Sequence, residues 1–400
     1  LQRIVYHPEV LETHEYWQGA MNKLLTVSTR RFDGKTLQVQ VIDRFSHPSR
    51  MTKDANAAYP DPQPMSGKNY TVTFSLVASE NDFGRHHASV SLHDTDLERR
   101  IGMTDQSAIR DFKKRMVDMC IKDVAESRYV HAYVPTTGRL AQVNGTVFKA
   151  DGAYADSAES SAVATTGGNR FRIDNGSLAY FSPGKKLSVY NSSGTFRFDV
   201  MTISVEPRDY SMVVYGLDAN GNPTTTVDIS AMADNDQLYV QGEKDQCPVS
   251  VASWMTRVTG TGTDTLFNRN RNDPDYWWMK PHFSGPLTAR PYALSDWDNV
   301  GIEQSYKNPT PDSGMVICGR PEMLSTIINA IGREVVIQFP SQDEKGKFMA
   351  QFGFDGAIVR HHRLGRVMLE PDALMKDNTI WWFKPGTWEQ LSYYADKWRW

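Results

Sequence analysis

Two segments near the start of the chain, separated by a long polar stretch, constrain the fold more than any other feature. In both segments apolar and polar residues alternate, and the apolar positions are Leu37, Val39, Val41, Tyr70, Val72, Phe74 and Leu76. A period of two is typical of a strand with one apolar face. The stretch between them, FSHPSRMTKDANAAYPDPQPMSGKN, is rich in Pro, Ser, Asp and Asn and cannot continue a strand ladder. The pattern predicts an extended β-hairpin over residues 36–80.

Such a hairpin needs cover, because an isolated two-stranded ribbon is only marginally stable in water. Two sources of cover are open. The apolar face can pack against another copy of the chain, or the strands can join a sheet within the same chain. We expect the first arrangement, which makes the seven apolar residues inter-subunit contacts.

Helical periodicity marks four other segments. The first, Pro8 to Leu25, belongs to an N-terminal arm. The clearest runs from Thr104 to Tyr133, where three- and four-residue steps separate Ile109, Phe112, Met116, Cys120 and Val124. This spacing predicts one long helix with those residues on its buried face. A weak helix is predicted near residues 295–307, and a stronger one over Pro321 to Ile331, with Pro in its first turn.

Short alternating runs replace the helical period between residues 170 and 242. They predict a compact all-β module of six or seven strands, inserted between two halves of another domain. The Gly-, Ala- and Ser-rich residues 134–169 are expected to form loops and short turns. Further strands are expected near the end of the chain, in EVVIQF, KFMAQFGF, AIVRHH, VMLEP, TIWWFK and WEQLSYY. This order of helices and strands predicts an α+β fold.

The charge balance argues against tight nucleic-acid binding. The chain has 44 Lys and Arg against 47 Asp and Glu, whereas proteins that neutralise phosphates carry a clustered basic excess. No apolar run approaches the roughly 20 residues of a membrane helix, and no charged-then-apolar segment at the start predicts export. Cys120, Cys247 and Cys318 match no metal-ligand spacing, so we expect reduced, mostly buried thiols.

One histidine-rich segment could supply metal ligands, and it contains His86, His87, His93, Asp94 and Asp96. That segment reads as a short strand, along which successive side chains point to opposite faces and do not converge on one point. We therefore predict no metal and no cofactor.

Ten tryptophans raise the possibility of carbohydrate chemistry. Aromatic rings could stack on a sugar and carboxylates could hydrolyse it, and the residues in question are Trp277, Trp278, Trp381, Trp382, Asp273, Asp275 and Glu389. Adjacent Trp residues in a strand face opposite ways, however, and packing is their commoner use. We predict no catalytic site and keep a carbohydrate-active enzyme as an alternative.

The order of elements resembles that of the major capsid proteins of tailed bacteriophages, which share the Hong Kong 97-type fold. The hairpin from Thr36 to Glu80 resembles their extended E-loop, and IRDFKKRMVDMCIKDVAESRY resembles the body of their spine helix. The run SPGKKLSVYNSSGTFRFDVMTISVEPRDYSMVV is similar to a small β-barrel that some of these coats carry. VICGRPEMLSTIINAI and the strands after it resemble the ending of their peripheral domain.

The resemblance implies a domain organisation. Its parts are an N-terminal arm (1–35), an E-loop hairpin (36–80), a peripheral domain with the spine helix (81–134), an axial domain (135–169 and 244–320), an inserted β-barrel (170–243) and a return to the peripheral and axial core strands (321–400).

The function that the resemblance implies is structural and not enzymatic. The chain would assemble with itself into hexamers and pentamers of an icosahedral shell around double-stranded DNA, which its inner face would contact weakly. Portal, scaffold and decoration proteins are further partners that the resemblance raises, and no membrane is involved. The implied location is the virion, with assembly in the host bacterial cytoplasm. Some relatives join the hairpin to a neighbour by a Lys–Asn bond, for which Lys53 and Lys68 are candidates. A tail or baseplate β-protein is a further alternative.

Overall fold

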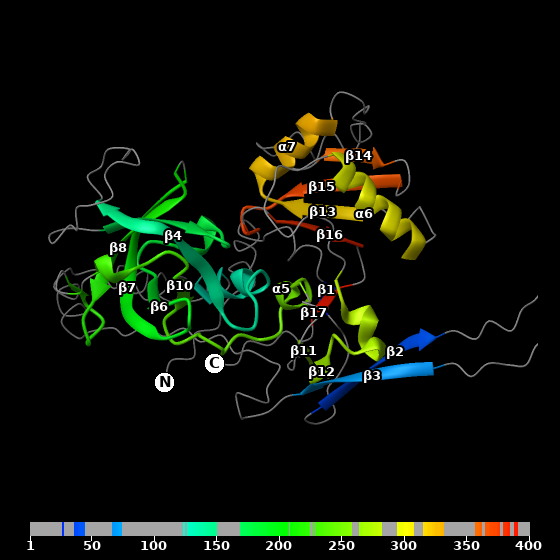
Figure 1. Ribbon diagram of the computed structural model, residues 1–400, viewed down its shortest axis with the longest axis horizontal. Helices are drawn as coiled ribbons and strands as arrows, with labels where there is room; N and C mark the ends of the chain where they lie inside the picture. The colour runs from blue at the N-terminus through cyan, green and yellow to red at the C-terminus, as the bar shows by residue number, and fades with distance from the viewer. Residues whose placement is uncertain are drawn as a thin grey trace, which may run out of the picture.

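The structure is a computed structural model of the chain (Figure 1). It describes residues 26–27, 36–44, 66–73, 123–124, 126–149, 169–207, 209–224, 227, 229–257, 264–281, 294–307, 315–331, 357–361, 365–376, 379–384 and 388–390. These residues form a β-barrel, a four-stranded sheet with two helices, and a two-stranded ribbon.

Six antiparallel strands close the barrel in the order β5-β4-β10-β6-β7-β8, because β5 also pairs with β8. They are β4 (Arg139–Lys149), β5 (Asn169–Asp174), β6 (Lys186–Tyr190), β7 (Phe196–Glu206), β8 (Ser211–Leu217) and β10 (Gln237–Val240). A short strand, β9 (Pro223–Thr224), pairs with β8, and two 3₁₀ turns, η3 (Leu178–Tyr180) and η4 (Ile229–Ala231), lie in the connections. Closure leaves no barrel strand with an unpaired edge.

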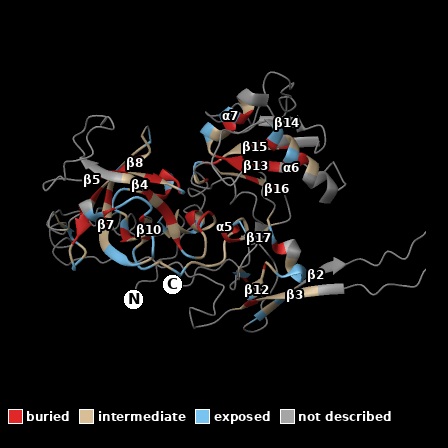
Figure 2. Cartoon of the chain, viewed as in Figure 1, coloured by how far each residue is buried: buried red, intermediate tan, exposed pale blue. Residues whose placement is uncertain are grey.

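The barrel is filled by side chains that are almost completely shielded from solvent. These include Leu140, Ile173, Leu187, Val189, Val200, Met212 and Leu238. Figure 2 shows buried segments in the barrel strands, whereas β7 is mostly half-buried or exposed. The alternating runs of this region therefore predict the compact all-β module correctly.

The predicted start of the barrel is wrong. Residues 134–169 were expected to form loops, yet β4 is an 11-residue strand of the barrel wall. The misleading signal is Asn144-Gly145, which is typical of a turn. Here it lies at a bulge, where the β4–β5 register shifts between Asn144 and Phe148 and Gly145 has a φ of +79°.

The second body is a four-stranded sheet in the order β14-β15-β13-β16. Its strands are β14 (Ala357–His361), β15 (Gly365–Pro371), β13 (Met315–Gly319) and β16 (Ile380–Phe383), and only β13 and β15 run parallel. Helices α6 (Leu294–Lys307) and α7 (Pro321–Ile331) lie beside each other near this sheet (Figure 1). All these elements were predicted from periodicity except β13.

The two faces of the sheet belong to different cores. Ile317, Val367 and Leu369 pack with Leu324 and Ile327 of α7. On the other face, a single cluster of buried side chains continues from the barrel into the sheet through Val316, Cys318, Trp381 and Phe383. Barrel and sheet therefore share one hydrophobic core.

The ribbon consists of β2 (Thr36–Arg44) and β3 (Ser66–Thr73), paired antiparallel as predicted. Leu37 pairs with Val72 and Val39 with Tyr70, so these four apolar side chains share one face. Among the described residues no third strand joins the ribbon. Phe74, Leu76 and residues 45–65 of the predicted tip lie outside the described residues. The predicted end of the tip is wrong, because its last four residues, Ser66 to Asn69, belong to β3.

Shorter elements connect these bodies. They are α5 (Val251–Trp254), the hairpin β11 (Thr265–Leu266) and β12 (Arg269–Asn270), the 3₁₀ segment η5 (Pro274–Met279), and the parallel pair of β1 (Thr26–Val27) with β17 (Glu389–Gln390).

Little of the predicted long helix can be compared. Residues 126–131 are helical, as is Val124, whose side chain is half-buried. Ile109, Phe112, Met116 and Cys120 lie outside the described residues, and so does the predicted helix of the N-terminal arm. No described helix is long and apolar enough to cross a bilayer. The described part of the chain is thus mostly β with few helices, which agrees with the α+β prediction only at this coarse level.

Candidate functional site

The root of the ribbon, where β3 meets the rest of the chain, is the candidate site. The Tyr70 ring stacks on Phe267 of the β11–β12 turn, with 5.2 Å between ring centroids, and meets the Trp254 ring edge-on at 6.2 Å. Val72, on the same face of the ribbon, is 3% exposed. Lys68 adds an ion pair with Asp275, with 2.7 Å between Nζ and Oδ2. These contacts fasten one end of the ribbon to its own chain.

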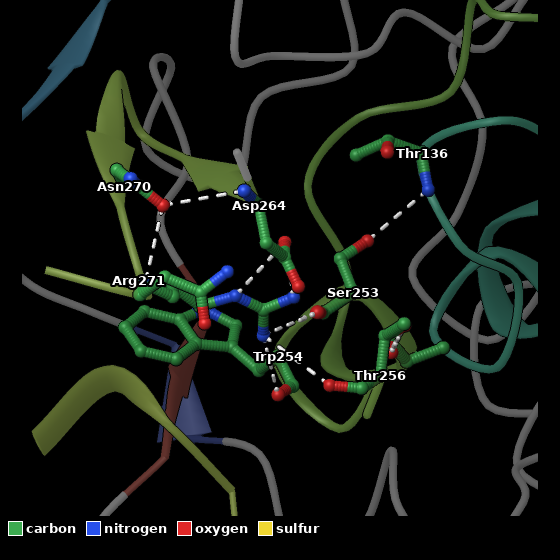
Figure 3. A network of polar contacts seen from close by, with 9 residues as sticks. Thr136, Ser253, Trp254, Thr256, Asp264, Asn270 and Arg271 are labelled. Carbon is green, nitrogen blue, oxygen red and sulfur yellow. Dashed lines mark hydrogen bonds and ion pairs between the residues drawn. The ribbon is translucent and has the colours of Figure 1, made fainter. Parts of the chain in front are cut away.

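Trp254 and Phe267 form a platform beneath Tyr70. A buried arginine holds this platform in place (Figure 3). The Arg271 side chain, 3% exposed, donates from Nη2 to Oδ1 of Asp264 at 2.7 Å and from Nε to the same oxygen at 3.2 Å. Its Nη1 donates to the backbone oxygens of Ser253, Trp254 and Thr256 at 3.2–3.5 Å. The C-terminal carbonyl groups of a helix have no partner within the helix. Arg271 satisfies those of Ser253 and Trp254, the last two residues of α5, and thereby positions Trp254.

The N-terminus of α5 is equally well defined. Ser250 caps it, since the Ser250 side chain accepts from the Ser253 backbone and the Ser253 side chain accepts from the Ser250 backbone. The Ser250 hydroxyl also donates to the Val134 carbonyl at 2.6 Å, and the Thr136 amide donates to Ser253 Oγ at 3.1 Å (Figure 3). Helix α5 is thus fixed to the barrel side at one end and to the ribbon platform at the other.

A continuous series of aromatic contacts links the ribbon root to the barrel–sheet core. It begins with Tyr70 and Trp254, and its further members are Trp388, Phe383, Trp381 and Tyr133, with 5.7–6.3 Å between neighbouring centroids. Trp388 directly precedes β17, which pairs with β1. Segments from both ends of the chain and from its middle therefore converge beneath the ribbon, and each ring contact is worth about 0.5–1.5 kcal/mol beyond area burial.

The end of this series is tied to the connection between β15 and β16. The Tyr133 hydroxyl, which is fully buried, donates to the Asp372 carboxylate. On the barrel side, Ser177 Oγ donates to the Ala373 carbonyl at 2.5 Å and the Tyr180 hydroxyl donates to the Leu374 carbonyl at 2.6 Å. Burial raises the Tyr180 pKa well above its usual value, with Asp372 adding to the effect, so this hydroxyl remains a donor at neutral pH.

The structure changes the assignment of the apolar ribbon face. Val72 is buried, and Tyr70, Leu37 and Val39 are half-buried. The Tyr70 ring stacks on Phe267 of the same chain. At its root this face therefore packs in part against its own chain, and its contact with a neighbouring copy stays a prediction. The sequence analysis did not predict the residues that pack beneath Tyr70. They lie nearly 200 positions away from Tyr70 in the sequence, and no pattern there points to the ribbon.

Trp381 and Trp382 do not form a shared stacking surface. Trp381 is buried against Tyr133 with nearly parallel rings, whereas Trp382 packs on the opposite face of the sheet with the α7 cluster. This is the alternation expected of a strand. The side chains of Trp277, Trp278 and Glu389 lie outside the described residues, and the Asp275 carboxylate is engaged by Lys68.

Two of the three cysteines are described, and both are free. Cys318 is buried in the sheet, and burial raises its thiol pKa, with Asp372 and Glu370 adding to the effect. For Cys247, burial and then the Glu243 and Asp245 carboxylates raise the pKa to about 12. The prediction of reduced thiols is confirmed for these two residues, although Cys247 is only half-buried.

Comparisons with known proteins give no further identification. No protein-family model, no curated protein and no solved structure matches this chain.

Tyr70→Ala should loosen the ribbon without unfolding the protein. Loss of the ring contacts with Phe267 and Trp254 should speed amide hydrogen exchange in β2 and β3 by about tenfold or more, because about 1.5 kcal/mol of packing is lost. Asn69→Ala is the matched control, since Asn69 is exposed on the opposite face of the same strand. Equal exchange rates in both variants would contradict the platform role.

Proposed function

We propose that the chain is a structural subunit that assembles with itself, in the manner of a tailed-phage major capsid protein. Copies would form hexamers and pentamers of an icosahedral shell around double-stranded DNA. The observation that carries the proposal is the ribbon: two paired strands, anchored at one end, whose other end points away from the barrel and the sheet (Figure 1). Anchoring gives a two-stranded arm a defined direction, which an isolated ribbon lacks.

Such an arm suits contact with a neighbouring copy. Its strands end at Arg44 and begin again at Ser66, so the Pro- and Ser-rich residues 45–65 are carried on its outer end. Because the apolar face at the root packs within the chain, we assign the inter-subunit contact to this outer end. The slight negative charge of the chain, −3, also suits a container that surrounds DNA without binding it tightly.

The structure reduces the number of candidate lysines for a covalent link between copies from two to one. Lys68 pairs with Asp275 of its own chain, and its side chain is 28% exposed. Of the two candidate lysines, we therefore propose only Lys53 for a Lys–Asn bond to a neighbour.

Replacement of residues 45–65 by a two-residue Asn-Gly turn tests the proposal. Asn-Gly suits a tight hairpin, so β2 and β3 should still pair and the subunit should stay folded. In negative-stain images the full chain should form polyhedral particles or capsomers, and the shortened variant should form none. Circular dichroism and thermal unfolding should be nearly unchanged.

The connection between β4 and β5 provides a matched control. Residues 150–168 are similar in length to 45–65 and also join an antiparallel pair, so the same Asn-Gly replacement should leave assembly intact. Closed particles from the variant without residues 45–65 would contradict the proposal. A full chain that stays monomeric at high concentration would contradict it as well, whereas tubes or fibres would favour a tail protein.

A further inference from the structure

Three side chains with metal-binding atoms meet beside the barrel. His131 ends the described helical residues 126–131, and Glu243 and Cys247 lie in the loop that follows β10. His131 Nε2 is 3.1 Å from Glu243 Oε2, and the ligand atoms of all three residues lie within 4.8 Å of one another. The side chains of His131 and Glu243 are only 12% and 30% exposed. Within the described residues no other group of this kind is found.

The backbone around the three residues is tightly held. The Asp245 amide donates to the Thr137 carbonyl at 2.9 Å, which ties the loop to the turn that precedes β4. Within the loop, the Glu243 amide donates to the Val240 carbonyl and the Gln246 amide donates to the Glu243 carbonyl, both at 3.0 Å. The ligand-bearing segments are therefore held in place by main-chain contacts that do not involve the three side chains.

Gly138 allows the two segments to approach this closely. Its φ is +79°, and a Cβ at this position would lie 2.7 Å from the Glu243 carbonyl oxygen and 3.1 Å from Cys247 Sγ. A larger residue would therefore push the loop, and two of the three ligands, away from the turn. Close backbone approach at this point is what brings the thiol and the carboxylate to His131.

The electrostatic surroundings favour a cation. The Glu243 and Asp245 carboxylates both act on the Cys247 thiol. Two cations lie nearby. Lys244 pairs with Asp245, with 3.9 Å between Nζ and Oδ2. Lys185 lies within electrostatic reach of Glu243, Glu126 and Asp123, and its Nζ donates to the Tyr180 carbonyl at 2.8 Å. Negative charge thus exceeds positive charge around the cluster.

We propose that His131, Glu243 and Cys247 bind one divalent transition-metal ion, with Zn²⁺ as the best match. Imidazole nitrogen, thiolate sulfur and carboxylate oxygen are the three ligand types that Zn²⁺ accepts in tetrahedral sites, at about 2.0–2.3 Å. Tetrahedral ligands are then roughly 3.3–3.7 Å apart, so the widest pair here needs to close by about 1 Å. As the metal–sulfur bond forms, the thiol proton passes to solvent, and a water molecule completes the fourth position.

Such a site would join the end of the helical segment to the loop leading into α5. It is independent of the capsid proposal, because it lies within one chain and its test requires no assembly. Metal binding to the folded state alone would also raise the stability of the protein.

Cobalt substitution tests the site in the full chain. Titration of metal-free protein with Co²⁺ should give one equivalent of bound metal, a thiolate-to-cobalt charge-transfer band and the intense visible bands of tetrahedral Co²⁺. Zn²⁺ should displace the cobalt and raise the midpoint of thermal unfolding. Absence of the charge-transfer band, or Zn²⁺ without effect on unfolding, would overturn the proposal.

Variants assign the ligands. Cys247→Ser should abolish the charge-transfer band, and His131→Gln and Glu243→Gln should each weaken Zn²⁺ binding by about 100-fold or more, beyond the 10- to 100-fold typical of residues that only support ligands. Asp245→Asn is the matched control and should retain binding within about tenfold. If Cys247→Ser fails to fold, the other two variants decide the question. A band that survives in Cys247→Ser and disappears in Cys318→Ala would overturn the assignment.

Discussion

Arg271→Ala should lower the free energy of unfolding by about 3 kcal/mol, the lower end of the cost of breaking a buried ion pair from one side, because the Asp264 carboxylate is 25% exposed. The substitution removes both donors to Oδ1 of Asp264, and it removes the donor to the Ser253, Trp254 and Thr256 carbonyl groups. A single side chain therefore bonds three carbonyl groups at the end of α5 and just after it as well as the Asp264 carboxylate (Figure 3).

The effect should also reach the ribbon. Trp254 and Phe267 support Tyr70, so loosening α5 and the β11–β12 hairpin should speed hydrogen exchange in β3 as well as lower the urea midpoint. Arg269→Ala is the matched control: Arg269 lies on the same hairpin but makes only a cation–π contact with Tyr276, at 5.4 Å, and its loss should cost about 1 kcal/mol or less. If the two variants are equally stable, the Arg271 network does not support the platform.

Lys376→Met should have the opposite effect to Arg271→Ala and raise the free energy of unfolding at pH 7 by about 2 kcal/mol. Lys376 follows the fully buried Met375 in the connection between β15 and β16, and burial, assisted by Arg139, lowers the lysine pKa from 10.5 to about 8. Below pH 8 the lysine is charged in both the folded and unfolded states, so the folded state carries the full cost of the buried charge. This pKa difference corresponds to about 3 kcal/mol, which partial solvent access reduces.

The pH dependence gives this prediction its signature. Between pH 8 and 10.5 the unfolded state binds the lysine proton more tightly than the folded state, so the cost disappears as pH rises. The stability gain of Lys376→Met over the unmodified protein should therefore shrink towards zero across this range in urea unfolding experiments. Lys280→Met, at an exposed position, should change stability by no more than about 0.5 kcal/mol at any of these pH values. A gain that is constant from pH 7 to 10.5 would show that packing, and not charge, is responsible.

The connection between β15 and β16, which contains Lys376, also attaches the sheet to the barrel. The β15–β16 connection carries Asp372, Ala373 and Leu374, which accept hydrogen bonds from Tyr133, Ser177 and Tyr180. The sheet is therefore attached to the barrel by both apolar and polar contacts. The joined barrel and sheet support α5, and Trp254 of α5 contacts Tyr70 at the root of the ribbon. The proposed role in assembly requires a ribbon that is anchored in this way.

Local periodicity was enough to predict most of the elements. The alternation around Leu37 and Val72 predicted the ribbon, and the helical spacing after Pro321 predicted α7, because both patterns depend only on neighbouring residues. It failed at β4, where the bulge at Gly145 looks like a turn in the sequence although the strand continues through it.

The sequence by itself thus determined most of the segments that become strands and helices, although not β4 or β13, and it determined that the ribbon would have one apolar face. Only the tertiary structure decided what covers that face at its root, and only it brought Arg271 to α5 and Cys247 to His131. The physical reason is the distance along the sequence between the residues that interact. Secondary structure is encoded in the spacing of adjacent side chains, whereas the contact between His131 and Glu243 joins residues 112 positions apart and depends on how the barrel, α5 and the sheet pack together.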